Sequence, residues 1–239
     1  MWGKKKTTKP KKVPASKAPA KTTAKKAPTK KVSKPAAAPK PDLIEQASSD
    51  IFALYALEEE MGRKVIGSEG IQKLFTDMKL DLASSPEILA FMWHCNCEEY
   101  GRITQLEFKN AWIKLQIGSL DDLKKNVPKQ LSKVYDNIRA DHYRSFYRFV
   151  FTYHREGMMK SVKTELCISL FELLFSDKFP LLSKFVTFVN DKQLEYMTLD
   201  EWEGVLDLLR DNPENLDNYD VMGAWPSLMD SFYEWSQNN

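Results

Sequence analysis

Two aspartates and one alanine near the C-terminus have the residue types and spacing of a recognition surface for a basic partner. Thr198 and Glu201 form a T-x-x-E capping box, which places Asp200 in the first turn of a helix. Asp230 lies one turn into a second helix, whose entry contains Ala224. Two carboxylates beside a small residue suit a lysine or arginine side chain. The alternative is that both aspartates only complement helix dipoles, an effect of about 0.3–1 kcal/mol each.

The entry to the second helix is the segment Gly223-Ala224-Trp225-Pro226. Proline suits the first turn of a helix, because its missing N–H would have no partner there. We expect Pro226 to begin the helix and Trp225 to anchor it against a core.

Cysteine and histidine, the other residues with reactive side chains, do not form a recognisable catalytic or metal-binding set. Cys95 and Cys97 lie beside His94, but a structural zinc site needs four ligands, and Cys167 stands alone. None of the three cysteines has neighbours that suggest an activated thiol. Phosphate-binding glycine loops are also missing from the sequence. We therefore expect no catalytic residue, metal or cofactor, with a thioester-forming ligase as an alternative.

One segment has the frame of an EF-hand calcium loop. Asn96, Gly101 and Glu107 fall at its first, sixth and twelfth positions. Tyr100, however, occupies the fifth position, where calcium requires a small oxygen ligand. Residues 190–201 repeat the frame more weakly. We predict helix–loop–helix geometry without metal, and a calcium-responsive protein is an alternative.

The elements that position these residues are predicted to be helices throughout. Apolar residues recur at helical spacing, and no run of alternating polar and apolar residues indicates a strand. The fold class is therefore all-α, in one domain over residues 43–239. The expected helices cover 43–61, 68–78, 86–93, 104–115, 120–124, 127–140, 141–156, 162–175, 178–190, 198–210 and 226–235.

A basic tail, residues 1–42, precedes this domain. Residues 1–41 contain fourteen lysines, seven of the twelve prolines and no acidic residue, so we predict disorder. Aromatic residues that would stack on bases do not interleave with the charges, so we do not expect specific nucleic-acid binding. A chromatin or nucleic-acid binder acting through the tail is nevertheless an alternative. Lysine clusters favour nuclear import, so we expect a nuclear and also cytoplasmic protein; the candidates are Lys4, Lys5, Lys6, Lys9, Lys11 and Lys12.

The domain itself is acidic, although the whole chain has a net charge of +2. Beyond residue 41, 21 basic and 33 acidic residues remain. Such a surface suits a basic partner. We expect no membrane partner, because no apolar run approaches the roughly 18–20 residues that cross a bilayer.

Several motifs with their spacing resemble the defective-in-cullin-neddylation family and its potentiating-neddylation (PONY) domain. The resemblance covers residues ~43–237. It implies paired EF-hand-like helix units that hold no metal. The motifs are Leu106-Glu107-Phe108, Phe146-Tyr147-Arg148-Phe149, Asp200-x-Trp202, Asn218-Tyr219-Asp220 and Gly223-Ala224-Trp225-Pro226.

The resemblance implies a scaffold-type ligase component without chemistry of its own. Such a protein binds the C-terminal winged-helix subdomain of a cullin and the N-acetylated N-terminus of the neddylation conjugating enzyme. Holding both together promotes transfer of the ubiquitin-like modifier to a cullin lysine. Asp200, Ala224 and Asp230 match the family's cullin-binding residues.

The resemblance also implies an apolar pocket for the acetylated peptide. The alternative is that its residues are ordinary core. Ile103 stands where an aromatic residue is expected, and Phe91 and Met92 replace smaller aliphatic residues, so the preferred conjugating enzyme stays open. The matching residues are Ile71, Ile88, Phe91, Met92, Ile103, Tyr153 and Leu173.

Overall fold

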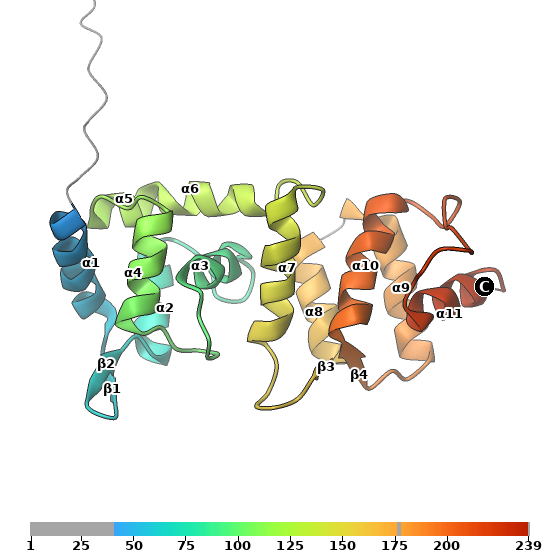
Figure 1. Cartoon of the computed structure of the whole chain (residues 1–239), viewed down its shortest axis with the longest axis horizontal. Coiled ribbons are helices and arrows are strands. Elements are labelled where there is room, and N and C mark those ends of the chain that lie inside the picture. Colours follow the sequence, from blue (N-terminus) through green and yellow to red (C-terminus); the bar gives the residue numbers. More distant parts are fainter. Residues whose placement is uncertain (1–40, 176–177, 239) are drawn as a thin grey trace, which may run out of the picture. The chain divides into compact units, whose positions relative to one another are not determined.

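The computed structural model describes residues 41–175 and 178–238, and helices dominate this part of the chain (Figure 1). The predicted all-α class is confirmed. The six candidate import lysines, like almost all of the predicted tail, lie outside the described residues. The helices are α1 (Pro41–Tyr55), α2 (Ser68–Asp77), α3 (Glu87–Cys95), α4 (Gln105–Lys114), α5 (Leu120–Lys125), α6 (Val127–Leu131), α7 (Asp141–Tyr153), α8 (Thr164–Phe175), α9 (Pro180–Asp191), α10 (Leu199–Asp211) and α11 (Ser227–Ser236), with a 3-10 turn η1 (Ser132–Val134).

Four short strands, which the sequence analysis did not predict, form two antiparallel pairs: β1 (Glu58–Glu60) with β2 (Arg63–Val65), and β3 (Ser161–Lys163) with β4 (Tyr196–Thr198). Among the described residues, no helix has the length and apolar character needed to span a bilayer.

The predicted helix over 43–61 is wrong at its C-terminal end. α1 ends at Tyr55, and the chain then forms the β1–β2 hairpin. Met61 and Gly62 connect the strands, with φ angles of 47° and 75°. Two successive positive φ angles are the geometry of a two-residue type I′ turn, which matches the twist of the flanking strands. β1 consists of three glutamates and shows no alternation of polar and apolar residues, so no sequence pattern predicts the hairpin.

The predicted helix over 127–140 is also shorter than expected. α6 ends at Leu131, and η1 adds a single turn. The Asn137 side chain then accepts a hydrogen bond from the backbone N–H of Arg139 (3.0 Å). An asparagine that bonds the backbone two residues ahead competes with the helix ladder, and this favours a turn.

Paired helix–loop–helix units divide the domain into two halves. In the first half, Ile103, the eighth residue of the EF-hand frame, exchanges backbone hydrogen bonds with Ile66 (3.0 and 2.9 Å). In the second half, Met197 holds the same position in residues 190–201 and pairs with Val162. The predicted helix–loop–helix geometry is therefore confirmed in both halves. α5 and α6 connect the halves along one side of the domain (Figure 1).

The core of the second half fixes the position of α10. Trp202 on α10 is fully buried and stacks on Tyr147 of α7, with ring centroids 4.4 Å apart. Trp202 Nε1 donates to the Tyr147 carbonyl, and Tyr147 Oη donates to the Trp202 carbonyl, both at 3.0 Å. Phe171 of α8 stacks against the same indole at 4.6 Å. Because Trp202 lies two residues after Asp200, these reciprocal hydrogen bonds position the first turn of α10.

Candidate functional site

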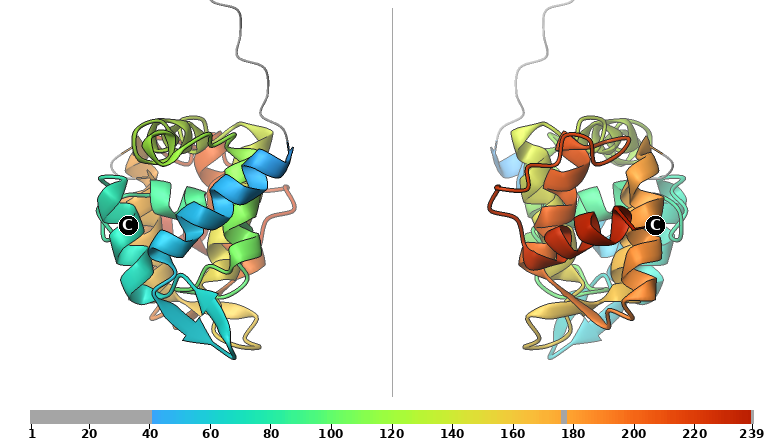
Figure 2. Two further views of the ribbon diagram at one scale, coloured as in Figure 1. Left: turned by 90° about the vertical axis from the view of Figure 1, so that its left-hand side faces the viewer. Right: turned by 90° about the vertical axis from the view of Figure 1, so that its right-hand side faces the viewer.

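The site begins with the close approach of α10 and α11 (Figure 2). A Cβ atom at Gly204 would lie 2.9 Å from Pro226 Cγ and 3.4 Å from Met229 Cγ, so the missing side chain lets α11 approach. Asp200 lies one turn before Gly204 on the same face of α10, and Asp230 follows Met229. The entry to α11 therefore packs against α10 one turn beyond Asp200.

All three predicted cullin-binding residues are exposed: Asp200 at the start of α10, Asp230 in the first turn of α11, and Ala224 just before α11. The T-x-x-E capping box is confirmed, since Thr198 Oγ1 accepts the Glu201 N–H and the Glu201 side chain bonds the Thr198 N–H. Pro226 was predicted to be the first helical residue, and this is wrong by one position. It is the N-cap, with an extended ψ of 141°, and α11 begins at the next residue.

A tyrosine holds the Asp230 side chain in position, and no spacing of residues in the sequence predicts this contact. Tyr219 Oη donates a hydrogen bond to Asp230 Oδ1 at 2.6 Å, across eleven residues. The Tyr219 ring stacks between Trp225 (5.2 Å) and Tyr233 (4.7 Å). Burial and the bond to Asp230 raise the pKa of Tyr219 well above its ordinary value, so it stays a proton donor.

A tight turn presents the apolar tip of the loop between α10 and α11. The Asp220 carboxylate accepts the Met222 N–H at 3.0 Å, while the Asp220 carbonyl accepts the Gly223 N–H and Trp225 Nε1, also at 3.0 Å. A side chain at Gly223 would lie only 2.8 Å from Trp225 Nε1. The turn leaves Val221 and Met222 59% and 89% exposed beside Ala224.

The segment that contains α10 and α11 is strongly acidic. Residues 200–238 contain ten acidic residues and a single basic one, Arg210. The Arg210 side chain lies 3.7 Å from Asp207 of the same helix, and its Nε donates to the Ile138 carbonyl at 2.7 Å. Arg144 and Arg148 of α7 pair with Asp207 and Glu203, whereas Asp200 and Asp230 form no ion pair within the described part of the chain. These two exposed carboxylates therefore leave a negative field that attracts a basic partner.

Three of the seven residues matched to the peptide pocket lie in the interior. Phe91 and Ile103 are fully buried, and Met92 is 3% exposed. Phe91 packs edge-on against Phe75, with centroids 5.7 Å apart. Cys97 Sγ lies 3.7 Å from Met92 Sδ. These contacts are those of core side chains.

The other four matched residues lie closer to the surface. Ile71 on α2 and Ile88 on α3 are each 9% exposed, and Leu173 on α8 is half-buried. Tyr153 Oη accepts the Gly101 N–H at 3.1 Å, so this residue joins the end of α7 to the EF-hand-like loop.

The EF-hand-like loop uses its last carboxylate internally. Glu107 is 8% exposed and accepts hydrogen bonds from the Thr104 N–H (2.6 Å), Thr104 Oγ1 (2.7 Å) and the Glu98 N–H (2.9 Å). These donors occupy the oxygens that a calcium loop would offer to the ion. In residues 41–175 and 178–238, no three His, Cys, Asp or Glu side chains are grouped to hold a metal.

The three cysteines are all buried. Burial raises the pKa of Cys95 well above its ordinary value and that of Cys167 to about 12. The thiols of Cys95 and Cys167 therefore stay protonated at neutral pH, whereas a nucleophilic cysteine needs a thiolate.

Comparison with known proteins identifies the relatives of the chain. A family model described as "Cullin binding" matches residues 122–235. DCN1-like protein 5 from Homo sapiens is 28% identical over 182 residues, covering 73% of this chain and 72% of that protein. DCN1-like protein 2 from Dictyostelium discoideum is 30% identical over 177 residues, covering 73% and 64%. The chain belongs to the DCN1-like family. This membership supports a role in cullin neddylation.

The cullin-binding match divides the candidate residues of this DCN1-like protein into two groups. Asp200, Ala224 and Asp230 lie inside the matched segment. Five of the seven residues assigned to the peptide pocket precede it, and only Tyr153 and Leu173 fall within it. The α10–α11 junction is thus the candidate site that belongs to the part matched as cullin-binding.

Proposed function

We propose that this protein is a scaffold-type cofactor of cullin neddylation, which holds a cullin and the charged conjugating enzyme together. The observation that supports this most is the pair of exposed carboxylates, Asp200 and Asp230, which form no ion pair within the described part of the chain. The partner surface is the C-terminal winged-helix subdomain of the cullin.

The two carboxylates receive lysine or arginine side chains of the cullin in this proposal. Ala224 leaves room beside them, and exposed Met222 supplies an apolar contact at the edge. Charged pairs of this kind guide association and fix orientation. The scaffold then acts by proximity, because it keeps the acceptor lysine near the thioester of the ubiquitin-like modifier.

Calorimetry with an isolated cullin winged-helix subdomain tests the first half of this proposal. Asp200→Lys or Asp230→Lys should weaken binding at least about ten-fold, since each places a cation opposite a basic partner. Glu172→Lys, an exposed charge reversal on α8, is the matched control and should bind like the wild type. Equal affinity of all three variants would show that the cullin binds elsewhere.

The second half of the proposal concerns the N-acetylated N-terminus of the conjugating enzyme. Ile71, Ile88 and Leu173 are the matched apolar residues that retain some surface, so they offer the first contact. Acetylation removes a positive charge whose burial would be unfavourable. An acetylated peptide from this N-terminus should therefore bind more tightly than the same peptide with a free amine, and equal affinities would contradict an apolar pocket.

A scaffold needs no reactive group of its own. The burial and raised pKa values of Cys95 and Cys167 support this assignment, because they keep the thiols protonated. With charged conjugating enzyme, non-reducing gels should show no modifier adduct on the protein. An adduct that disappears in a cysteine-to-serine variant would make this protein a thioester-forming ligase instead.

A further inference from the structure

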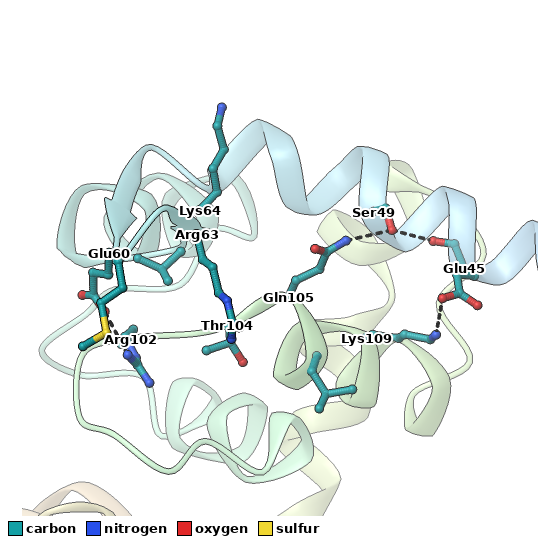
Figure 3. Close-up of a pocket in the computed structure, with 12 residues that line it drawn as sticks. Glu45, Ser49, Glu60, Arg63, Lys64, Arg102, Thr104, Gln105 and Lys109 are labelled. Atoms are coloured by element: carbon teal, nitrogen blue, oxygen red, sulfur yellow. Dashed lines mark hydrogen bonds and ion pairs between the residues drawn. The ribbon is translucent and has the colours of Figure 1, made fainter.

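A groove of about 910 Å³ lies in the first EF-hand-like half (Figure 3), at the end of the domain away from the α10–α11 junction (Figure 1). α1 forms one wall through Glu45 and Ser49, and the β1–β2 hairpin forms the other. The first turns of α4 close the floor, where Gln105 Nε2 donates to Ser49 Oγ at 3.1 Å. The groove is separate from the three residues proposed for cullin binding.

A short backbone edge faces this groove. The N–H and C=O of Ile66 both bond to Ile103. Orientation alternates along a strand, so the N–H and C=O of Lys64 point to the same edge, away from β1. After Ile103 the chain turns into α4, for which Thr104 is the N-cap. Among the described residues no strand continues along this edge, and Val65 and Lys64 line the opening.

The acidic side chains of the groove are all paired, whereas two of its basic side chains are not paired with any described residue. Its two carboxylates are already paired, Glu60 with Arg102 at 2.8 Å and Glu45 with Lys109 at 2.7 Å (Figure 3). In contrast, Arg63 and Lys64 are exposed and make no ion pair with any residue of the described part of the chain.

Apolar side chains accompany these cations at the groove. Met61 at the hairpin turn is fully exposed, and Leu106 on α4 is 68% exposed. A hollow that combines a free strand edge, two unpaired cations and exposed apolar residues fits an extended peptide. Main-chain hydrogen bonds supply affinity in such strand addition, and the side chains supply specificity.

We propose that this groove binds an extended acidic segment of a partner protein, which adds to the free edge of β2 at Lys64. Acidic side chains of that segment pair with Arg63 and Lys64, and an apolar side chain lies between Met61 and Leu106. The basic tail of the same chain does not suit the groove, because its lysines would meet the two unpaired cations. This proposal does not depend on the neddylation role.

The test uses the full chain and an acetylated probe peptide, Glu-Asp-Leu-Glu-Val-Asp-Glu-Asp. The fourteen tail lysines also attract acidic peptides, so the readout must be residue-specific. Amide and methyl NMR shifts should move and saturate at Lys64, Val65 and Leu106 at a moderate salt concentration. Saturating shifts confined to the tail would overturn the proposal.

Three variants and one modified peptide sharpen this test. Arg63→Glu/Lys64→Glu should weaken the groove affinity at least ten-fold, and Arg63→Gln/Lys64→Gln should weaken it less while avoiding new repulsion within the hairpin. Lys129→Glu/Lys133→Glu, an equal charge change at the exposed surface of α6 and η1, should leave it unchanged. A peptide N-methylated at its central residues should lose groove binding. Equal binding by the N-methylated peptide, or by the Arg63/Lys64 charge-reversal variant, would contradict strand addition.

Discussion

At the scale of single residues, the Tyr219–Asp230 hydrogen bond decides where one of the two exposed carboxylates points. Tyr219→Phe should cost about 0.5–1 kcal/mol of unfolding free energy, near the low end for a hydrogen bond because Asp230 is exposed. It should also weaken cullin binding several-fold, because Asp230 loses its fixed position. Urea unfolding and calorimetry measure the two effects. Tyr233→Phe, which keeps a stacked ring and removes another hydroxyl, is the control; the same loss in both variants would contradict a specific role for Tyr219.

A second prediction at this scale concerns His94. Burial first, and then the positive charges of Lys114 and His142, lower the pKa of His94 to about 4 in the folded protein. In the unfolded chain the value is about 6.5, so the unfolded state takes up a proton first as the pH falls. Folding stability should therefore decrease between about pH 6.5 and 4.

The measurement is the urea midpoint at pH 7 and pH 5. His94→Gln should reduce the difference between the two midpoints, and His142→Gln, at an exposed position on α7, should largely retain it. Part of the pH dependence should persist in both variants, because burial also lowers the pKa of His154. An unchanged pH difference in His94→Gln would contradict the assignment.

The residues of the candidate site differ in how well the sequence predicts them. Asp200 was placed correctly in a first turn, because a capping box is a local pattern of four residues. The bond between Tyr219 and Asp230 spans eleven residues and depends on the path of the loop. Similarly, burial of Phe91 depends on packing between helices, so its spacing alone did not separate pocket from core.

At the scale of elements, Gly204 controls the contact between α10 and α11. Gly204→Ala would place a Cβ 2.9 Å from the Pro226 ring, so the entry to α11 must shift. Overpacking of this kind costs about 1–3 kcal/mol, and it should outweigh the better helix propensity of alanine. Gly118→Ala is the control, since a Cβ there meets no atom within 4 Å. Thermal unfolding should separate the two variants, and equal midpoints would show that α11 adapts without strain.

The elements themselves were largely predictable where the pattern was local. α5 begins at the expected residue, with Ser119 as its N-cap, and α4 begins one residue after the expected start, with Thr104 as its N-cap. The β1–β2 hairpin was missed because its turn uses Met61 at positive φ, a residue that rarely signals a turn. The β3–β4 pair joins residues 161–163 to 196–198, and such distant pairing has no signature in a single sequence.

At the scale of the whole molecule, a basic tail is joined to an acidic domain. We propose that the lysine clusters of residues 4–12 direct nuclear import and that the adaptor activity belongs to residues 43–239. Deleting residues 1–41 should therefore preserve stimulation of neddylation and abolish nuclear accumulation of a fluorescent fusion. Loss of stimulation on deletion would assign the activity to the tail, and retained nuclear accumulation would exclude the tail as the import signal.

The most direct test of the central claim is a reconstituted cullin-neddylation assay that compares the wild type with Asp200→Lys/Ala224→Arg/Asp230→Lys. All three positions are exposed, so the variant should fold, which circular dichroism checks. The wild type should accelerate modifier transfer to the cullin, and the variant should lose at least about ten-fold of that acceleration because the basic partner is repelled. Acceleration by the variant equal to that of the wild type would contradict the α10–α11 site, and no acceleration by the wild type would contradict the proposed function.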